Sequence, residues 1–305
     1  RHLVAQPAFP KQHITHGGRH IDELAHFFTR VFQAGRIGET KMLKLYHGTT
    51  SVCAAKVRLV MYEKGMSFES ELLNLQQGDQ HRPEYLKLNP NGVIPTLVHD
   101  GNVIIESSII LGYLDEAFPD PPLMPADPAL RARARLWMKR VDDTVHPAIG
   151  SLTHATVYRP AFLALDEDAR AERLDKIPDP NRRARFAAVY RDGLDAPVAT
   201  ASVQTLNTLI VDMEARLAAS DFLVGNAYSL ADAAVTPYVN RLFDMGLLGL
   251  WAISAPGVLK WYSAIRERAS FAPAIIDYLT DTDRAAFEAM DPETPGRVME
   301  ILSAG

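Results

Sequence analysis

Residues 89–97, together with the Glu106-Ser107 pair that follows them, have the residue types expected of a peptide-binding site. A turn-forming Asn-Pro-Asn-Gly leads into an apolar run that Pro95 interrupts, and a proline within a strand lies at an edge or bulge because it donates no ladder hydrogen bond. If the Ile94–Pro95 bond is cis, Ile94 turns outward, and its N–H and C=O are free to pair with an extended peptide. Ser107 opens a helical pattern, where backbone N–H groups favour a carboxylate, and Glu106 can accept an ammonium. The stretch therefore predicts a receptor for a free amino-acid terminus carried on a peptide, although it fits equally an ordinary proline turn and helix N-cap.

The composition argues against several other kinds of site. The chain has 305 residues, of which 47% are hydrophobic and 23% charged, and its net charge of −5 gives no basic footprint for nucleic acid or an anionic membrane. No apolar run approaches the ~20 residues of a membrane span. The single cysteine, Cys53, excludes an internal disulfide and a zinc site built on paired cysteines, so we expect a cytoplasmic protein. The histidines are scattered, and the pair His16 and His20 flanks two glycines, so we predict no metal.

Residues 42–119 have the pattern of a compact α/β domain. Asp100-Gly101 is a hairpin turn signal, and Gly65 is a C-cap that ends the first helix. The order β-α-β-α-β-β-α predicts one sheet with helices on its faces. In chain order, the predicted elements are strand 43–46, helix 52–64, strand 68–75, helical turn 84–88, strand 94–99, strand 103–106 and helix 107–118.

Proline clusters at 119–122 and 125–128 predict a domain boundary, and the rest of the chain is predicted to be helical, as a domain over 128–280. Asp127 is an N-cap with proline at the first helical position. Ser229 and Asp232 form a capping-box variant before a buried apolar helix. We expect residues 281–305 to be a polar tail that drapes over the surface or frays. The other predicted helices span 129–150, 166–176, 181–191, 198–218, 256–268 and 271–279.

Residues 1–41 differ in composition from the rest, with histidines mixed among Gly17-Gly18 and two prolines. They lack the uninterrupted apolar core of a secretory signal. We interpret them as an extension, either added artificially or lying upstream of a natural start at Met42, and leave them out of the fold prediction.

Several motifs occur together in this chain that resemble one family. They are Tyr46 with Ser51-x-Cys53 before a helix, Asn89-Pro90 with Ile94-Pro95, Glu106-Ser107, and Ser229-x-x-Asp232 late in a helical half. The combination resembles the cytosolic glutathione transferases over residues 42 to about 279. The resemblance implies an α/β thioredoxin-like N-terminal domain followed by an all-α helical bundle domain, with glutathione as co-substrate.

The resemblance also implies roles for individual residues in binding glutathione. Ile94 would pair its backbone with the cysteinyl unit, and Glu106 and Ser107 would hold the γ-glutamyl end. Asn91 or Lys87 would reach the glycine carboxylate.

Two residues match positions that handle sulfur in this family. Ser51 falls where the serine-type classes place a hydroxyl that donates to the glutathione thiolate, and such a bond raises the thiolate fraction of a thiol whose pKa is near ~8.5. Cys53 falls where the cysteine-type classes have a cysteine able to form a mixed disulfide, but Ala54 replaces their usual proline. Free cysteine also packs as a small apolar residue. We therefore favour Ser51 over Cys53, with Thr50 and Thr49 as further alternatives.

A long segment between residues 153 and 198 resembles bacterial glutathione-dependent β-aryl-etherases, which split lignin-derived dimers. The matching features are the acidic run 166–168, the break at 177–180, the basic run 181–186, and residues 221–224, 62–65 and 99–101. The implied reaction is attack of the glutathione thiolate on the carbon that bears the aryloxy group, α to a ketone, with a phenolate leaving. The basic residues Arg182, Arg183 and Arg185 also fit a solvated helix face.

The pocket for the electrophile is expected between the domains. Its predicted lining, which fits a helical core equally well, is Trp137, Val141, Ile149, Tyr158 and Tyr190.

Other functions of the family remain alternatives at this stage. A zeta-like cis-trans isomerase is favoured by Ser51 and Cys53, which match two positions of its Ser-Ser-Cys signature, and its acidic substrates would need cationic groups facing the pocket. A general detoxifying transferase or dehalogenase, and a non-enzymatic ligand carrier or regulatory partner, are also consistent with the fold. The presence of Ser51, Glu106 and Ser107 together argues against the carrier.

The family also implies a homodimer. The chain itself offers Phe118 and the row Arg131, Arg133 and Arg135 as interface candidates, and the arginine row fits ordinary surface equally well.

Overall fold

The computed structural model of the protein describes residues 42–304, and the predictions made for residues 1–41 lie outside them. The first domain consists of β1 (Leu43–His47), α2 (Val52–Glu63), β2 (Glu69–Leu72), α3 (Pro83–Leu86), β3 (Thr96–His99), β4 (Asn102–Ile105) and α4 (Ser107–Ala117).

The strands of residues 42–304 form one four-stranded sheet in the order β2-β1-β3-β4. β1 is parallel to β2 and antiparallel to β3, and β4 is antiparallel to β3. Asp100 and Gly101 join β3 to β4 with φ values of 48° and 81°, as a two-residue hairpin turn requires. The predicted α/β order is confirmed, although β2 is shorter than the predicted strand 68–75 because the chain beyond Leu72 leaves the ladder.

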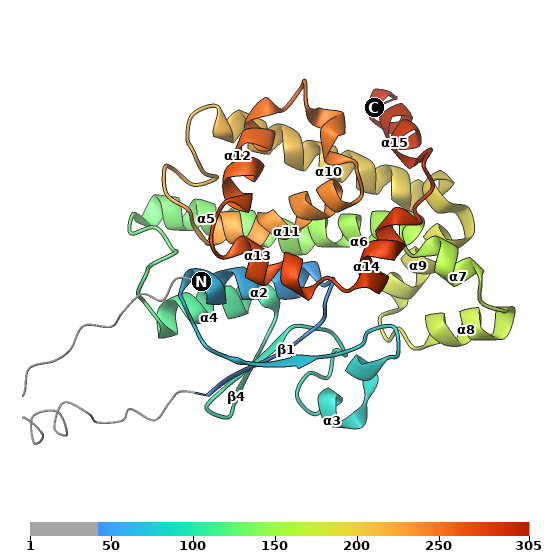
Figure 1. Cartoon of the computed structure of the whole chain (residues 1–305), viewed down its shortest axis with the longest axis horizontal. Helices are drawn as coiled ribbons and strands as arrows, with labels where there is room; N and C mark the ends of the chain where they lie inside the picture. Colours follow the sequence, from blue (N-terminus) through green and yellow to red (C-terminus); the bar gives the residue numbers. More distant parts are fainter. Residues whose placement is uncertain (1–41, 305) are drawn as a thin grey trace, which may run out of the picture. The chain divides into compact units, whose positions relative to one another are not determined.

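Two helices of the first domain are buried between its sheet and the helical domain. Figure 1 shows α2 and α4 lying between the sheet and α11 (Leu230–Asp244). One apolar cluster joins Leu45 and Leu97 of the sheet to Val60 of α2, Leu111 of α4 and Ala233 of α11. Because both domains share this core, the loops at one end of the sheet are held against the helical domain.

The predicted single helix 129–150 is divided into α5 (Pro128–Arg140), a π-helical turn (Val141–Val145) and α6 (His146–Thr156). In the wider turn, the N–H of His146 donates to the carbonyl of Val141, five residues back. Pro147 gives the physical reason, because its ring would clash with the carbonyl four residues before it and it has no N–H to donate. The interruption was missed because apolar spacing alone does not reveal it.

The capping box before α11 is confirmed. The Asp232 carboxylate accepts from the N–H of Ser229 at 3.0 Å and its hydroxyl at 2.8 Å, from the Leu223 N–H at 3.0 Å, and from the Trp261 indole at 3.0 Å. This buried carboxylate ties the start of α11 to α12 (Pro256–Arg266), so α11 is fixed at the centre of the helical domain.

The last 25 residues of the sequence were predicted to drape or fray, and this is wrong for the part that the structure describes. That part forms α14 (Asp281–Glu288), which begins with a Thr280–Asp283 capping box, and α15 (Thr294–Ser303). Val298 is buried, and the Gln204 amide donates to the Ile301 carbonyl at 2.8 Å, which fixes α15 to α10 (Pro197–Leu217). This segment is polar on average, so its composition does not reveal the narrow apolar stripe that packs against the helical domain.

The remaining helices are α7 (Arg159–Leu163), α8 (Glu167–Asp175), α9 (Pro180–Asp192) and α13 (Phe271–Ala274), which a 3₁₀ turn (Ile276–Tyr278) follows in place of the rest of the predicted helix 271–279. No helix of residues 42–304 is both long and apolar enough to cross a lipid bilayer.

Candidate active site

The strand register brings the predicted glutathione-binding residues to one end of the sheet. β3 pairs Thr96 with Ile105 of β4, so Ile94, which precedes Thr96, lies at the same end as Glu106, which follows Ile105. Ser107 is the first residue of α4 and is 6% exposed. The exposed Glu106 before it has a φ of 66°, a costly conformation for a residue with a side chain. A carboxylate placed here would meet the N-terminus of α4.

The loop that carries Ile94 is held by hydrogen bonds from α3 and from the residues that follow it. The Ile94–Pro95 bond is cis. The Tyr85 hydroxyl and the Asn89 amide both donate to the Val93 carbonyl, at 2.6 and 2.8 Å. The predicted residues for the glycine carboxylate, Asn91 and Lys87, are both exposed beside this loop.

Ser51 lies at the same end of the sheet. Thr96 pairs with Tyr46 of β1, and the chain after β1 passes Ile94 so closely that a Cβ on Gly48 would lie 2.9 Å from its Cδ1. Ser51 is the N-cap of α2, where its Oγ accepts from the Ala54 N–H at 3.2 Å. The hydroxyl hydrogen of Ser51 is therefore available to another acceptor.

The chain before Ser51 is fixed by both domains. Arg58 donates to the Thr49 carbonyl at 3.3 Å, Arg241 of α11 donates to the Thr50 carbonyl, and the Thr50 hydroxyl lies 3.2 Å from the Tyr158 hydroxyl. A hollow between the domains is lined by Thr49, Thr50, Ser51, Val52, Ala55, Arg58, Pro237, Asn240, Arg241, Asp244, Ile275 and Leu279.

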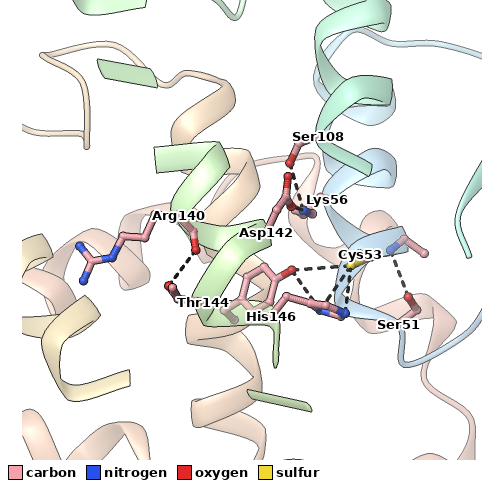
Figure 2. Close-up of polar contacts among 10 residues, drawn as sticks. Ser51, Cys53, Lys56, Ser108, Arg140, Asp142, Thr144 and His146 are labelled. Atoms are coloured by element: carbon pink, nitrogen blue, oxygen red, sulfur yellow. Dashed lines mark hydrogen bonds and ion pairs between the residues drawn. The ribbon is translucent and has the colours of Figure 1, made fainter. Parts of the chain in front are cut away.

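Cys53 contacts the helical domain through a set of partners that Figure 2 shows. Its Sγ lies 3.4 Å from Nδ1 of His146, the first residue of α6, and 3.7 Å from the hydroxyl of Tyr238 on α11. Burial opposes ionisation of the thiol, but the charges of His146 and Lys56 and the hydrogen bonds from His146 and Tyr238 outweigh it and lower the pKa of Cys53 to about 6. The thiolate in turn raises the pKa of His146. Each group therefore favours the charged form of the other, a thiolate at Cys53 and an imidazolium at His146.

The π-helical turn positions this pair. Lys56 is fully buried and its ammonium lies 2.9 Å from Asp142 of the turn and 3.3 Å from the Ser108 hydroxyl. Asp142 and His146 are four residues apart across the turn, so the same distortion presents one to Lys56 and the other to Cys53 (Figure 2). Sequence reasoning missed His146, Lys56 and Tyr238. The available signal was Pro147, which is incompatible with a regular helix at that point.

The predicted electrophile pocket needs correction. Val141 and Ile149 are 0% and 1% exposed within the core of the helical domain, because the distorted helix turns them inward. Trp137 lines a separate hollow with Arg140 and Leu223, away from the loop that bears Ser51. Tyr158 reaches that loop through Thr50, whereas Tyr190 is buried against His154, with its hydroxyl 2.6 Å from the ring nitrogen.

Two family models match this chain, the glutathione S-transferase N-terminal domain over residues 45–122 and the C-terminal domain over residues 182–264. Protein LigF from Sphingobium sp. is 29% identical over 248 residues, which cover 79% of this chain and 95% of LigF. Its crystal structure, described as a beta-etherase, has a TM-score of 0.70 at 28% identity and covers 76% of this chain and 98% of its own.

Glutathione S-transferase Z2 of Arabidopsis thaliana is 28% identical over 241 residues, 79% of this chain and 93% of that protein. The fold, the matched domain models and these similarities agree, and the chain belongs to the glutathione S-transferase family, whose members use glutathione as co-substrate.

Proposed function

We propose that this protein is a glutathione transferase in which the Ser51 hydroxyl donates a hydrogen bond to the glutathione thiolate. The observation that carries the proposal is the capping geometry: Ser51 Oγ accepts from the Ala54 N–H, which leaves its hydrogen free at the end of the sheet where Ile94 and Ser107 also lie. Ile94 pairs its backbone with the cysteinyl unit, the N-terminus of α4 at Ser107 receives the γ-glutamyl carboxylate, and Glu106 accepts the γ-glutamyl ammonium. The exposed Asn91 or Lys87 reaches the glycine carboxylate.

The proposed reaction is cleavage of a β-aryl ether. The thiolate attacks the carbon that bears the aryloxy group, a C–S bond forms, the C–O bond breaks, and the pair of electrons leaves with a phenolate. The similarity to the beta-etherase LigF supports this class of substrate. A phenolate is a fair leaving group, so the protein's main task is to keep the sulfur ionised and aligned.

The experiment is incubation of the protein with glutathione and a β-aryl ether dimer, with detection of the free phenol and the glutathione thioether. Ser51→Ala removes the hydrogen bond, and one charge-assisted bond of ~1.5–3 kcal/mol corresponds to a loss of about ten- to 150-fold in kcat at pH 7. The loss should shrink as pH rises and the thiol ionises without help. Ser51→Thr is the matched control, because it keeps both the helix cap and the hydroxyl.

A second candidate function is favoured by the Cys53–His146 pair. In thiol exchange, the Cys53 thiolate attacks the glutathione sulfur of a mixed disulfide, a new S–S bond forms, and the other thiol leaves as its thiolate. This second function predicts that Cys53→Ala loses disulfide reduction and any mixed disulfide with glutathione that intact mass detects, while ether cleavage remains. Full ether cleavage by Ser51→Ala at pH 7, combined with its loss in Cys53→Ala, would overturn the proposed role of Ser51.

A further inference from the structure

The helix pair α8 and α9 has arginines on its inner face and acids on its outer face. In α8, Arg170 and Arg173 are half-buried and one turn apart, whereas the acidic side chains Glu167, Asp168, Glu172 and Asp175 are exposed. In α9, Arg182 and Arg185 are likewise half-buried and three residues apart. We call these four arginines the arginine face. This arrangement differs from the solvated helix face that the sequence also allowed for Arg182 and Arg185.

The arginine face lacks carboxylate partners, although Arg170 donates to the carbonyl of Leu163. Within residues 42–304, no carboxylate forms an ion pair with any of the four, and the Nε atoms of Arg170 and Arg185 are buried without a hydrogen bond. Asp179 is the acid that acts on Arg182, but it is exposed and its carboxylate already accepts the Asn181 N–H at 2.9 Å. Half-buried cations that find no carboxylate in the protein favour an anionic ligand.

An aromatic cluster lies next to these charges. The His154 ring stacks on Phe186 at 3.8 Å, and its Nδ1 lies 2.6 Å from the Tyr190 hydroxyl. Burial, then the charges of Arg173, Arg241 and Arg182, lower the pKa of His154 to about 3, so this imidazole is neutral. Arg173 and Arg182 therefore lie near an uncharged aromatic cluster, a combination that suits a ligand with a ring and a negative group.

The same surface extends to the sulfur site. The ring of Tyr158, just after α6, lies 5.2 Å from the ring of His154, and its hydroxyl lies 3.2 Å from that of Thr50, the neighbour of Ser51. On the other domain, both ring nitrogens of His81 are buried without a hydrogen-bond partner. Burial, and then the charges of Arg182 and Lys176, lower the pKa of His81. Arg182 of the helical domain thus lies close enough to His81 of the first domain for its charge to act there, which places Arg182 where the two domains meet.

We propose that Arg173 and Arg182 bind the carboxylate of an aromatic second substrate whose ring packs against Phe186 and Tyr158. The inference rests on the proposed transferase function and narrows its substrate class to aryl electrophiles that carry a carboxylate. Arginine suits this task because its planar donors match both oxygens of a carboxylate. The glycine carboxylate of glutathione has the same chemistry, so the test must separate the two sources.

The test compares 4-chloro-3-nitrobenzoate with its methyl ester, in which glutathione displaces the same chloride. Because the ester group activates the ring more strongly than the carboxylate does, each kcat/KM is divided by the rate constant of the uncatalysed reaction with glutathione. On this scale, wild-type protein should have the higher kcat/KM for the acid. Arg182→Gln and Arg173→Gln should each lower kcat/KM for the acid about tenfold, as expected for the loss of one charge-assisted hydrogen bond. The same variants should lower kcat/KM for the ester less than about twofold. Arg191→Gln is the matched control, because Arg191 is exposed on α9 and paired with Asp192 at 2.7 Å.

Three outcomes have different meanings. If the variants raise KM for glutathione equally with both electrophiles, the arginines bind the glycine carboxylate and the inference is wrong. If the variants lose kcat/KM equally with the acid and the ester, and KM for glutathione does not change, the inference is also wrong. If wild-type protein turns over neither compound, the transferase function fails for this class, and equilibrium dialysis of the acid and the ester against wild-type protein and Arg182→Gln still decides whether the carboxylate is bound.

Discussion

Replacement of His146 by Gln should make Cys53 behave as an ordinary thiol. The imidazole lies 3.4 Å from Sγ, and its charge is the largest of the influences that favour the thiolate. With a pKa of about 6, half of the thiol is ionised at pH 6, against roughly 0.3% for an unperturbed thiol of pKa ~8.5. Nucleophilicity falls with pKa by a Brønsted factor of ~0.4–0.5, which costs about tenfold over this range. The net expectation is reaction about tenfold faster than an unperturbed thiol at pH 6.

The assay is alkylation by iodoacetamide followed by intact mass. Because Cys53 is the single cysteine of the chain, one added adduct reports its reactivity without peptide mapping. The rate of the wild-type protein should rise with a midpoint near pH 6, and that of His146→Gln should move toward 8.5. Asp143→Asn is the matched control, since Asp143 lies in the same π-helical turn but pairs outward with Lys139 at 2.6 Å. A wild-type midpoint near 8.5, or no shift in His146→Gln, would refute the assignment of a thiolate–imidazolium pair.

Three further predictions test the anchor, the fold and the assembly. Ser107→Ala should raise KM for glutathione with little change in kcat, because its contact is equal in ground and transition states; an unchanged KM in steady-state kinetics means the anchor is misassigned. Asp232→Ala should lower the free energy of unfolding by about 3 kcal/mol or more in urea titration, since four buried donors lose their acceptor; a loss below about 1 kcal/mol contradicts this. Light scattering should give about twice the mass of one chain, and the mass of a single chain would exclude the homodimer.

Local signals in the sequence predicted most of the elements that position the site. Asp127 accepts from the Leu130 N–H as the N-cap of α5, and the Asp100-Gly101 turn closes the β3–β4 hairpin. Such features depend on a few neighbouring residues whose side chains satisfy backbone groups directly. Ser107 at the start of α4 follows from the same kind of reasoning, because the apolar spacing after it sets the helix boundary.

Contacts between distant segments could not be predicted in this way. His146 is 93 residues from Cys53, and the two meet where the π-helical turn joins α5 to α6. Arg182 is half-buried on α9, whose Phe186 stacks on His154 of α6, and no local pattern encodes that packing. Helical spacing identifies a face of a helix, but tertiary packing decides whether that face meets core, solvent or a ligand.

The two residues that match sulfur-handling positions of the family occupy different surroundings, although the sequence places them only two apart. Ser51 has an extended backbone and caps α2 at the end of the sheet beside Ile94. Cys53 lies within the helix and contacts His146 of α6 (Figure 2) and Tyr238 of α11. The proposed role of Ser51 toward the glutathione thiolate and a charged Cys53 thiolate are thus not alternatives for one position. Because the Cys53 charge is already compensated by His146, ionisation of glutathione at Ser51 does not require Cys53 to be neutral, and both chemistries are compatible with one fold.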